Sequence, residues 1–190
     1  MQPKQTKSKA TLWFYVPLWL LFVYLYFQIL AIGPNGSGNI ILGGMYFVEF
    51  GVHEASHMVT AFLPSILCAA AGSIGEMTFT WLLAYAAFRA KSYFAGAFTL
   101  LWVMLAMTSA GNYMADARAQ QMQLIGLGSD PKHDWNYVFG QLGWLNWDTF
   151  IGGTVRLLGD VAGLVGLIIG LVVIIGIVFR PNQVRGTTAT

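Results

Sequence analysis

The sequence predicts an all-α fold, a polytopic bundle of four to five transmembrane helices that forms one integral membrane domain over residues 1–190. Two observations support this prediction. Of the 190 residues, 56% are hydrophobic and only 9% are charged, whereas soluble domains have about 25% charged residues. The apolar residues also gather into runs of about 20, the length that a helix needs to cross the hydrocarbon core.

Local sequence signals mark where the apolar runs begin and end. Three lysines make a basic tail over residues 1–10, which leads into the first run. The second run ends at Pro64, because the residue before a proline is pushed out of helical geometry. The third starts soon after this proline or at Ser73, where the residues Ser-Ile-Gly-Glu fit a capping box. The expected spans are 12–32, 40–63, 66–88 or 73–88, 94–115 and 151–179.

Two polar stretches complete the chain. Residues 116–148 form a loop between the fourth and fifth runs, and residues 180–190 form a polar C-terminal tail. The loop contains Trp135, Tyr137, Trp144 and Trp147, which predict an interfacial helix anchored by an aromatic belt.

The basic tail predicts a cytoplasmic N-terminus, because lysine and arginine are enriched on that side of membrane proteins. Counting five alternating crossings from there places three regions on the cytoplasmic side: the end of the second run, the end of the fourth and the 116–148 loop. All three histidines of the chain fall in these regions. We therefore expect a multi-pass membrane protein whose histidines share the cytoplasmic side.

The second run contains the sequence His-Glu-Ala-Ser-His at residues 53–57, an H-E-x-x-H motif. Residues four apart lie on one face of a helix, so His53 and His57 can bind the same Zn²⁺ ion. Glu54 lies beside them and can take a proton from a zinc-bound water as the general base. The single cysteine, Cys68, excludes a cysteine-rich zinc cluster.

Catalytic zinc usually takes three protein ligands and a water, so a further ligand is required. Asp116, after the fourth run, and His133, in the long loop, are equal candidates by chemistry and by side of the membrane. Asp134 is expected to orient a ligand or position the substrate. Glu49 lies four residues before His53 and is expected to orient an imidazole without binding the metal itself.

These residues resemble the intramembrane zinc metalloproteases of the site-2 protease group. The resemblance covers about residues 49–118 and rests on the H-E-x-x-H motif, followed two helices later by Asn112 and Asp116. The chain lacks the Leu-Asp-Gly and Asn-x-x-Pro elements that usually surround the family's aspartate ligand. The resemblance implies a zinc site with His53 and His57 as ligands and Glu54 as base. It also implies Asp116 as a ligand, with Asn112 beside it in an orienting or substrate-positioning role.

The predicted function is a membrane-embedded zinc-dependent hydrolase, most simply a metallopeptidase that cleaves a membrane protein or peptide within or near the membrane. Two other functions fit the same residues: a hydrolase of membrane lipid amides or esters, and a non-catalytic protein that binds or transports a metal. A structural alternative is that the two histidines are only hydrogen-bonded packing residues.

The expected partners are membrane lipids and a membrane protein or peptide substrate. A net charge of +2 does not indicate nucleic acid, and no cofactor-binding residues are expected besides those for zinc. The last run carries Gly159, Gly163, Gly166 and Gly170, which predict a small-residue face for close helix packing. This face can pack within the bundle or against a second copy of the chain.

Overall fold

The computed structural model describes residues 5–32, 38–124 and 132–179, and all regular secondary structure in these residues is helical. The elements are α1 (Gln5–Leu30), α2 (Ile40–Thr60), α3 (Ser65–Arg89), α4 (Tyr93–Ala115), α5 (Asp134–Leu142), a 3₁₀ turn η1 (Leu145–Trp147) and α6 (Asp148–Val178). Residues 1–4 of the basic tail and the polar tail at 180–190 lie outside the described residues.

Four helical stretches of the described chain are long and apolar enough to cross a membrane: Leu12–Leu30, Ser65–Arg89, Tyr93–Ala115 and Leu145–Val178. They confirm the predicted all-α membrane bundle and fit a multi-pass membrane protein. The 21-residue helix α2 is not among the four. It carries the two motif histidines together with Glu49 and Glu54, which lower its mean hydropathy.

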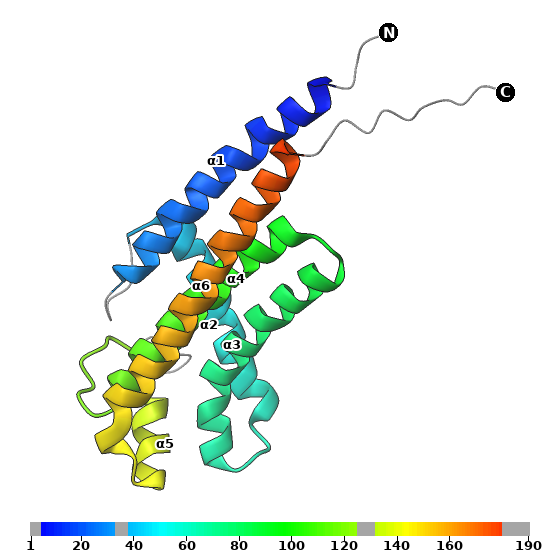
Figure 1. Cartoon of the computed structure of the whole chain (residues 1–190). Helices are drawn as coiled ribbons and strands as arrows, with labels where there is room; N and C mark the ends of the chain where they lie inside the picture. The colour runs from blue at the N-terminus through cyan, green and yellow to red at the C-terminus, as the bar shows by residue number, and fades with distance from the viewer. Residues whose placement is uncertain (1–4, 33–37, 125–131, 180–190) are drawn as a thin grey trace, which may run out of the picture.

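Helix α4 lies at the centre of the bundle, and α6 packs along its length (Figure 1). The two helices approach closely because the α6 glycines face α4. A Cβ at Gly159 or Gly163 would clash with Met104 or Met107, and one at Gly166 would clash with the carbonyl oxygen of Ala97. These glycines therefore pack within the chain, which is the first of the two alternatives that the sequence left open.

Helices α1 and α2 both run in the same direction as α4. On α1, Tyr15 packs on Phe94 and Phe22 packs on Phe98, so residue numbers rise together along α1 and the first half of α4. On α2, the ring of His53 lies 6.2 Å from that of Tyr113, near the end of α4. The end of α1 and the start of α2 meet at the middle of α4, in the apolar cluster that contains Ile29, Leu42 and Met104.

This arrangement corrects the count of five alternating crossings. Two successive crossings must run in opposite directions, whereas α1 and α2 run in the same direction, one after the other along α4. The start of α1 and the end of α6 consequently lie at one end of the molecule, and α5 lies at the other (Figure 1). The end of α2, the end of α4 and α5 still share one end, as the sequence predicted.

Helix α3 begins at Ser65, directly after Pro64, which shows that the capping box at Ser73 was a wrong prediction. Ser73 is instead buried in mid-helix, where its hydroxyl accepts a hydrogen bond of 2.9 Å from Nε1 of Trp135. The sequence pattern was misleading because the partner of Ser73 comes from α5, far along the chain.

Helix α5 is held against the first half of α3 and the end of α4. Besides the bond from Trp135 to Ser73, the side-chain amide of Asn136 donates to the carbonyl oxygen of Ala117 at 2.8 Å. Gly143 ends the helix in the left-handed conformation, with a φ of 70°, which glycine adopts without strain. Trp135 is buried, contrary to the aromatic-belt prediction, whereas Trp144 and Trp147 are exposed near the start of α6.

Candidate metal centre

Two imidazole nitrogens and one carboxylate oxygen converge where α2, α3 and α5 meet. Oδ2 of Asp134 lies 3.4 Å from Nε2 of His53 and 3.3 Å from Nε2 of His57. A tetrahedral zinc ion with ligands at about 2.0–2.1 Å holds neighbouring ligand atoms about 3.3–3.4 Å apart. The two distances to Asp134 therefore match the ligand spacing of a zinc site.

Contacts on the far side of each imidazole ring fix its orientation. Nδ1 of His57 donates a hydrogen bond of 2.8 Å to the carbonyl oxygen of Cys68. Nδ1 of His53 lies 3.6 Å from Oε2 of Glu76. Because a carbonyl or carboxylate oxygen accepts a hydrogen bond from Nδ1–H, each neutral ring presents Nε2 as the free ligand atom. Metal-binding histidines are held in this way by a carbonyl or a carboxylate.

Asp134 is positioned by Tyr113 and by the docking of α5. The hydroxyl of Tyr113 accepts the backbone N–H of Asp134 at 2.9 Å and lies 3.3 Å from Oδ2 of the same residue. Burial alone would raise the pKa of Asp134, but hydrogen bonds from His53 and His57 lower it to about 2. Asp134 is consequently a carboxylate at neutral pH, which is the form that binds a metal ion.

Gly72 on α3 provides the space in front of the two imidazoles. A Cβ atom at this position would clash with Nε2 of both His53 and His57. Any residue other than glycine would therefore occupy the space that the two ligand nitrogens face.

Glu54 follows His53 on α2 and is partly exposed. Its carboxylate lies close enough to Tyr113 to interact electrostatically with the hydroxyl that holds Asp134. Glu54 is not a member of the ligand group. The H-E-x-x-H motif assigns the role of general base to the glutamate at this position.

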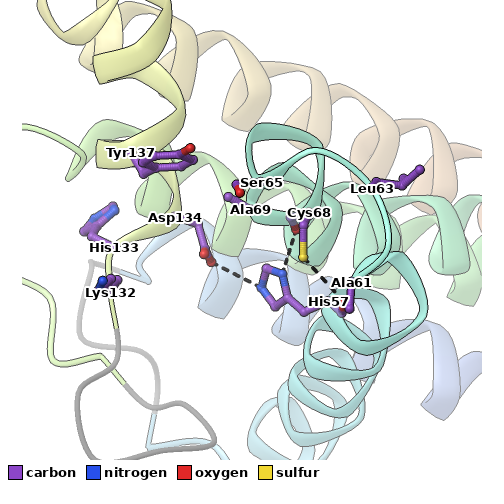
Figure 2. A pocket seen from close by; sticks show the side chains of 10 residues that line it. All are labelled: His57, Ala61, Leu63, Ser65, Cys68, Ala69, Lys132, His133, Asp134 and Tyr137. Atoms are coloured by element: carbon purple, nitrogen blue, oxygen red, sulfur yellow. Dashed lines mark hydrogen bonds and ion pairs between the residues drawn. The ribbon is translucent and has the colours of Figure 1, made fainter.

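A pocket of about 550 Å³ lies beside the group, between the α2–α3 connection and the start of α5 (Figure 2). His57 and Asp134 form part of its wall, and Figure 2 shows the His57 ring between the Asp134 carboxylate and Cys68. The other side chains that line the pocket are small or apolar on the α2–α3 side and polar on the α5 side. The lining residues are Ala61, Leu63, Ser65, Cys68, Ala69, Lys132, His133 and Tyr137.

The two residues predicted as the further ligand have other partners. Both oxygens of Asp116 accept backbone N–H groups, from Gln121 and Met122 at 2.9 Å each. Nδ1 of His133 accepts the N–H of Asn136 and caps α5, while Nε2 lies 3.5 Å from Oδ2 of Asp116. Within the described residues, Asp134 completes the one group of histidine, cysteine and acidic side chains whose ligand atoms lie within 4.8 Å of one another.

The predicted orienting residues also differ from those in the structure. Asn112 accepts a hydrogen bond of 2.9 Å from Nη1 of Arg156, which joins α4 to α6. Glu49 is fully buried, but Glu76 is the carboxylate that approaches His53. Sequence reasoning assigned Glu76 to a capping box and missed Tyr113 and Gly72. The spacing of four between Gly72 and Glu76 was an available signal, since it places both on the same face of α3.

Comparison with known proteins identifies no relative. No family model, no curated protein and no solved structure matches the chain. The resemblance to the site-2 protease group stays a prediction based on the motif.

Proposed function

We propose that His53, His57 and Asp134 bind one Zn²⁺ ion and that the chain is a metal-dependent hydrolase of the membrane. The convergence of two Nε2 atoms on one carboxylate oxygen at zinc-like spacing is the observation that supports this proposal. Two nitrogen ligands and one oxygen ligand, all hard or borderline, suit zinc. Three protein ligands also leave the fourth position open, as catalytic zinc sites do.

The chemistry assigned to the chain is the attack of water on a carbonyl group. Zinc, when bound, would lower the pKa of its water ligand and polarise the carbonyl oxygen. Glu54 would accept the proton that the water loses and return it to the leaving group, so that the carboxylate is regenerated. The pocket beside His57 would hold the part of the substrate next to the scissile bond.

A peptide bond of a membrane protein is the favoured substrate, because an H-E-x-x-H helix with its glutamate next to a ligand is the arrangement of metallopeptidases. An amide or ester of a membrane lipid is the second candidate. The apolar wall formed by Ala61, Leu63 and Ala69 would accommodate an acyl chain.

The proposal is tested with purified full-length protein in detergent micelles. Zinc content is measured by mass spectrometry, and hydrolysis is followed with a quenched fluorescent transmembrane peptide and with a fluorescent acyl-amide lipid. We expect about one zinc per chain, loss of zinc in the His53→Ala/His57→Ala double variant, and retained zinc without hydrolysis in Glu54→Gln.

The outcomes separate the alternatives. Cleavage of the peptide or of the lipid, abolished by Glu54→Gln, identifies the substrate class. Bound zinc without cleavage of either probe would reject the hydrolase and leave a metal-binding protein. Unchanged metal content in the double variant would reject the site itself.

A further inference from the structure

We infer that the end of the molecule carrying the metal group faces the non-cytoplasmic side of the membrane. We call this the metal end; it comprises the end of α2, the end of α4, α5 and the start of α6. The opposite end is the basic end, and it comprises the start of α1, the α3–α4 turn and the end of α6. The inference names the compartment from which the substrate of the proposed hydrolase arrives. It rests on helix directions and charges, and it holds even if the site is not catalytic.

Helix directions place both chain ends on the same side. The four membrane-crossing candidates α1, α3, α4 and α6 alternate in direction, since α1 runs parallel to α4 while α3 and α6 run antiparallel to it. Two sets of contacts show the antiparallel directions. Phe88 lies against Gly96 across the α3–α4 turn. Along α6, Gly152 lies against Gly111 and Gly166 against Ala97, so residue numbers rise on α6 as they fall on α4. Four alternating crossings return the chain to the side where it began.

The positive charges of the sequence gather toward the basic end. Three lysines precede or begin the first apolar run, Arg89 and Lys91 lie at the α3–α4 turn, and two arginines follow α6 in the sequence. No acidic residue occurs in the sequence between residues 1 and 48, between 77 and 115, or after 160. Such a concentration of unopposed lysine and arginine next to apolar spans marks the cytoplasmic side, where the leaflet is anionic.

The cations at the metal end are fewer, and two of them have partners within the fold. Nη2 of Arg118 lies 3.3 Å from Oδ1 of the buried Asp148, and Arg156 donates to Asn112 at 2.9 Å. Lys132 is exposed and lines the pocket. Among the described residues, the exposed cations of the metal end are therefore Arg118 and Lys132, whereas seven of the ten lysines and arginines of the sequence belong to the basic end.

The helix directions and the charges together reverse the orientation that five crossings would give. A cytoplasmic N-terminus and a cytoplasmic metal group are compatible only if an even number of crossings separates them. In the structure, α1 starts at the basic end, whereas α2 ends and α3 starts at the metal end. With the basic end in the cytoplasm, substrate would reach the pocket from the opposite side.

Cysteine accessibility in the full-length protein tests this orientation. Cys68 is replaced by alanine to give a cysteine-free parent, into which Ser92→Cys or Gln141→Cys is introduced. Both positions are exposed, Ser92 at the α3–α4 turn and Gln141 on α5. Intact cells expressing each variant are treated with a membrane-impermeant maleimide, and complete labelling in detergent confirms that each thiol is reactive.

We expect the Gln141→Cys variant to be labelled in intact cells and the Ser92→Cys variant to be labelled only after permeabilisation. The reverse pattern, or equal labelling of both variants in intact cells, would overturn the inference. Labelling does not depend on zinc or on turnover, so a failure of the proposed hydrolase leaves this result interpretable.

Discussion

Oδ2 of Asp134 lies 3.4 Å from Nε2 of His53, although 81 positions of sequence separate the two residues. Nothing in the spacing of the motif specifies this partner. The contact exists because Tyr113, Trp135 and Asn136 hold the start of α5 against the first half of α3 and the end of α4.

Asp134→Asn should reduce zinc affinity by more than about 100-fold, since a neutral amide oxygen replaces a ligand carboxylate. Asp116→Asn is the matched control, because Asp116 bonds the backbone of Gln121 and Met122. We expect the control to bind zinc within about 10-fold of the parent. Competition with a zinc chelator dye measures both. Equal losses in the two variants would contradict the assignment of Asp134.

Gly72→Ala should abolish zinc binding while α3 stays folded. The added Cβ would clash with both ligand nitrogens, whereas alanine is favoured over glycine in a helix by about 1 kcal/mol. Gly51→Ala on α2 is the control, because a Cβ there has no neighbour within 4 Å. Metal content and far-ultraviolet circular dichroism of both variants provide the measurement. Zinc retained in Gly72→Ala would show that the ion lies elsewhere.

Glu76→Gln should weaken zinc binding by about 10- to 100-fold, the usual effect of removing a group that orients a metal-binding histidine. Glu49→Gln should have a smaller effect, because Glu76 and not Glu49 approaches Nδ1 of His53. Zinc affinities measured by competition would rank the two variants. The opposite ranking would restore the role that the sequence suggested for Glu49.

His133 should make the stability of the metal-free protein dependent on pH. Burial lowers the pKa of His133 in the folded chain, despite the opposing effect of Asp116. The unfolded chain therefore binds a proton more readily, and stability should fall as the pH drops below the ordinary value of about 6.5. Protonated Nδ1 also cannot accept the N–H of Asn136.

His133→Asn should flatten this pH dependence, because asparagine also caps helices and does not titrate between pH 7 and 5. Thermal unfolding of the chelator-treated parent and variant across this range is the measurement. A difference in Tm between parent and variant that is the same at pH 7 and at pH 5 would contradict the prediction.

Ala69→Leu should lower turnover of whichever probe is cleaved while zinc content stays at the parental level. The larger side chain would fill part of the pocket beside His57 without removing a ligand. Ala86→Leu is the control on the same helix, at an exposed position away from the pocket. A raised KM in the pocket variant alone would support a substrate role for the pocket. Unchanged kinetics would place the substrate elsewhere.

The sequence predicted the helices more accurately than their directions. The end of the fourth span at Ala115 and the end of the second near Pro64 follow from apolar length and from proline, both local properties. The direction of α2 relative to α1 depends on packing against α4, and no local pattern encodes it. The start of α3 was ambiguous because the burial of Ser73 depends on Trp135.

The candidate site also has a part that the sequence predicts and a part that only the fold reveals. His53, Glu54 and His57 lie on one helix, so their spacing in the sequence shows their spacing in the structure. The remaining members come from α3, α4 and α5, and only the folded chain shows that Asp134 approaches the histidines. His133 and Asp116 were candidates by ligand chemistry and by their side of the membrane, and the structure places them next to each other.

The docking of α5 has a consequence for biogenesis. During synthesis the chain emerges from its N-terminal end, so His53 and His57 enter the membrane well before Asp134 has been made. The two histidines alone form an incomplete site, and the group closes only when Trp135 and Asn136 attach α5 to the helices already in place. The group of His53, His57 and Asp134 is thereby assembled only after α5 has been made, when α6 is the one helix of the described chain still to follow.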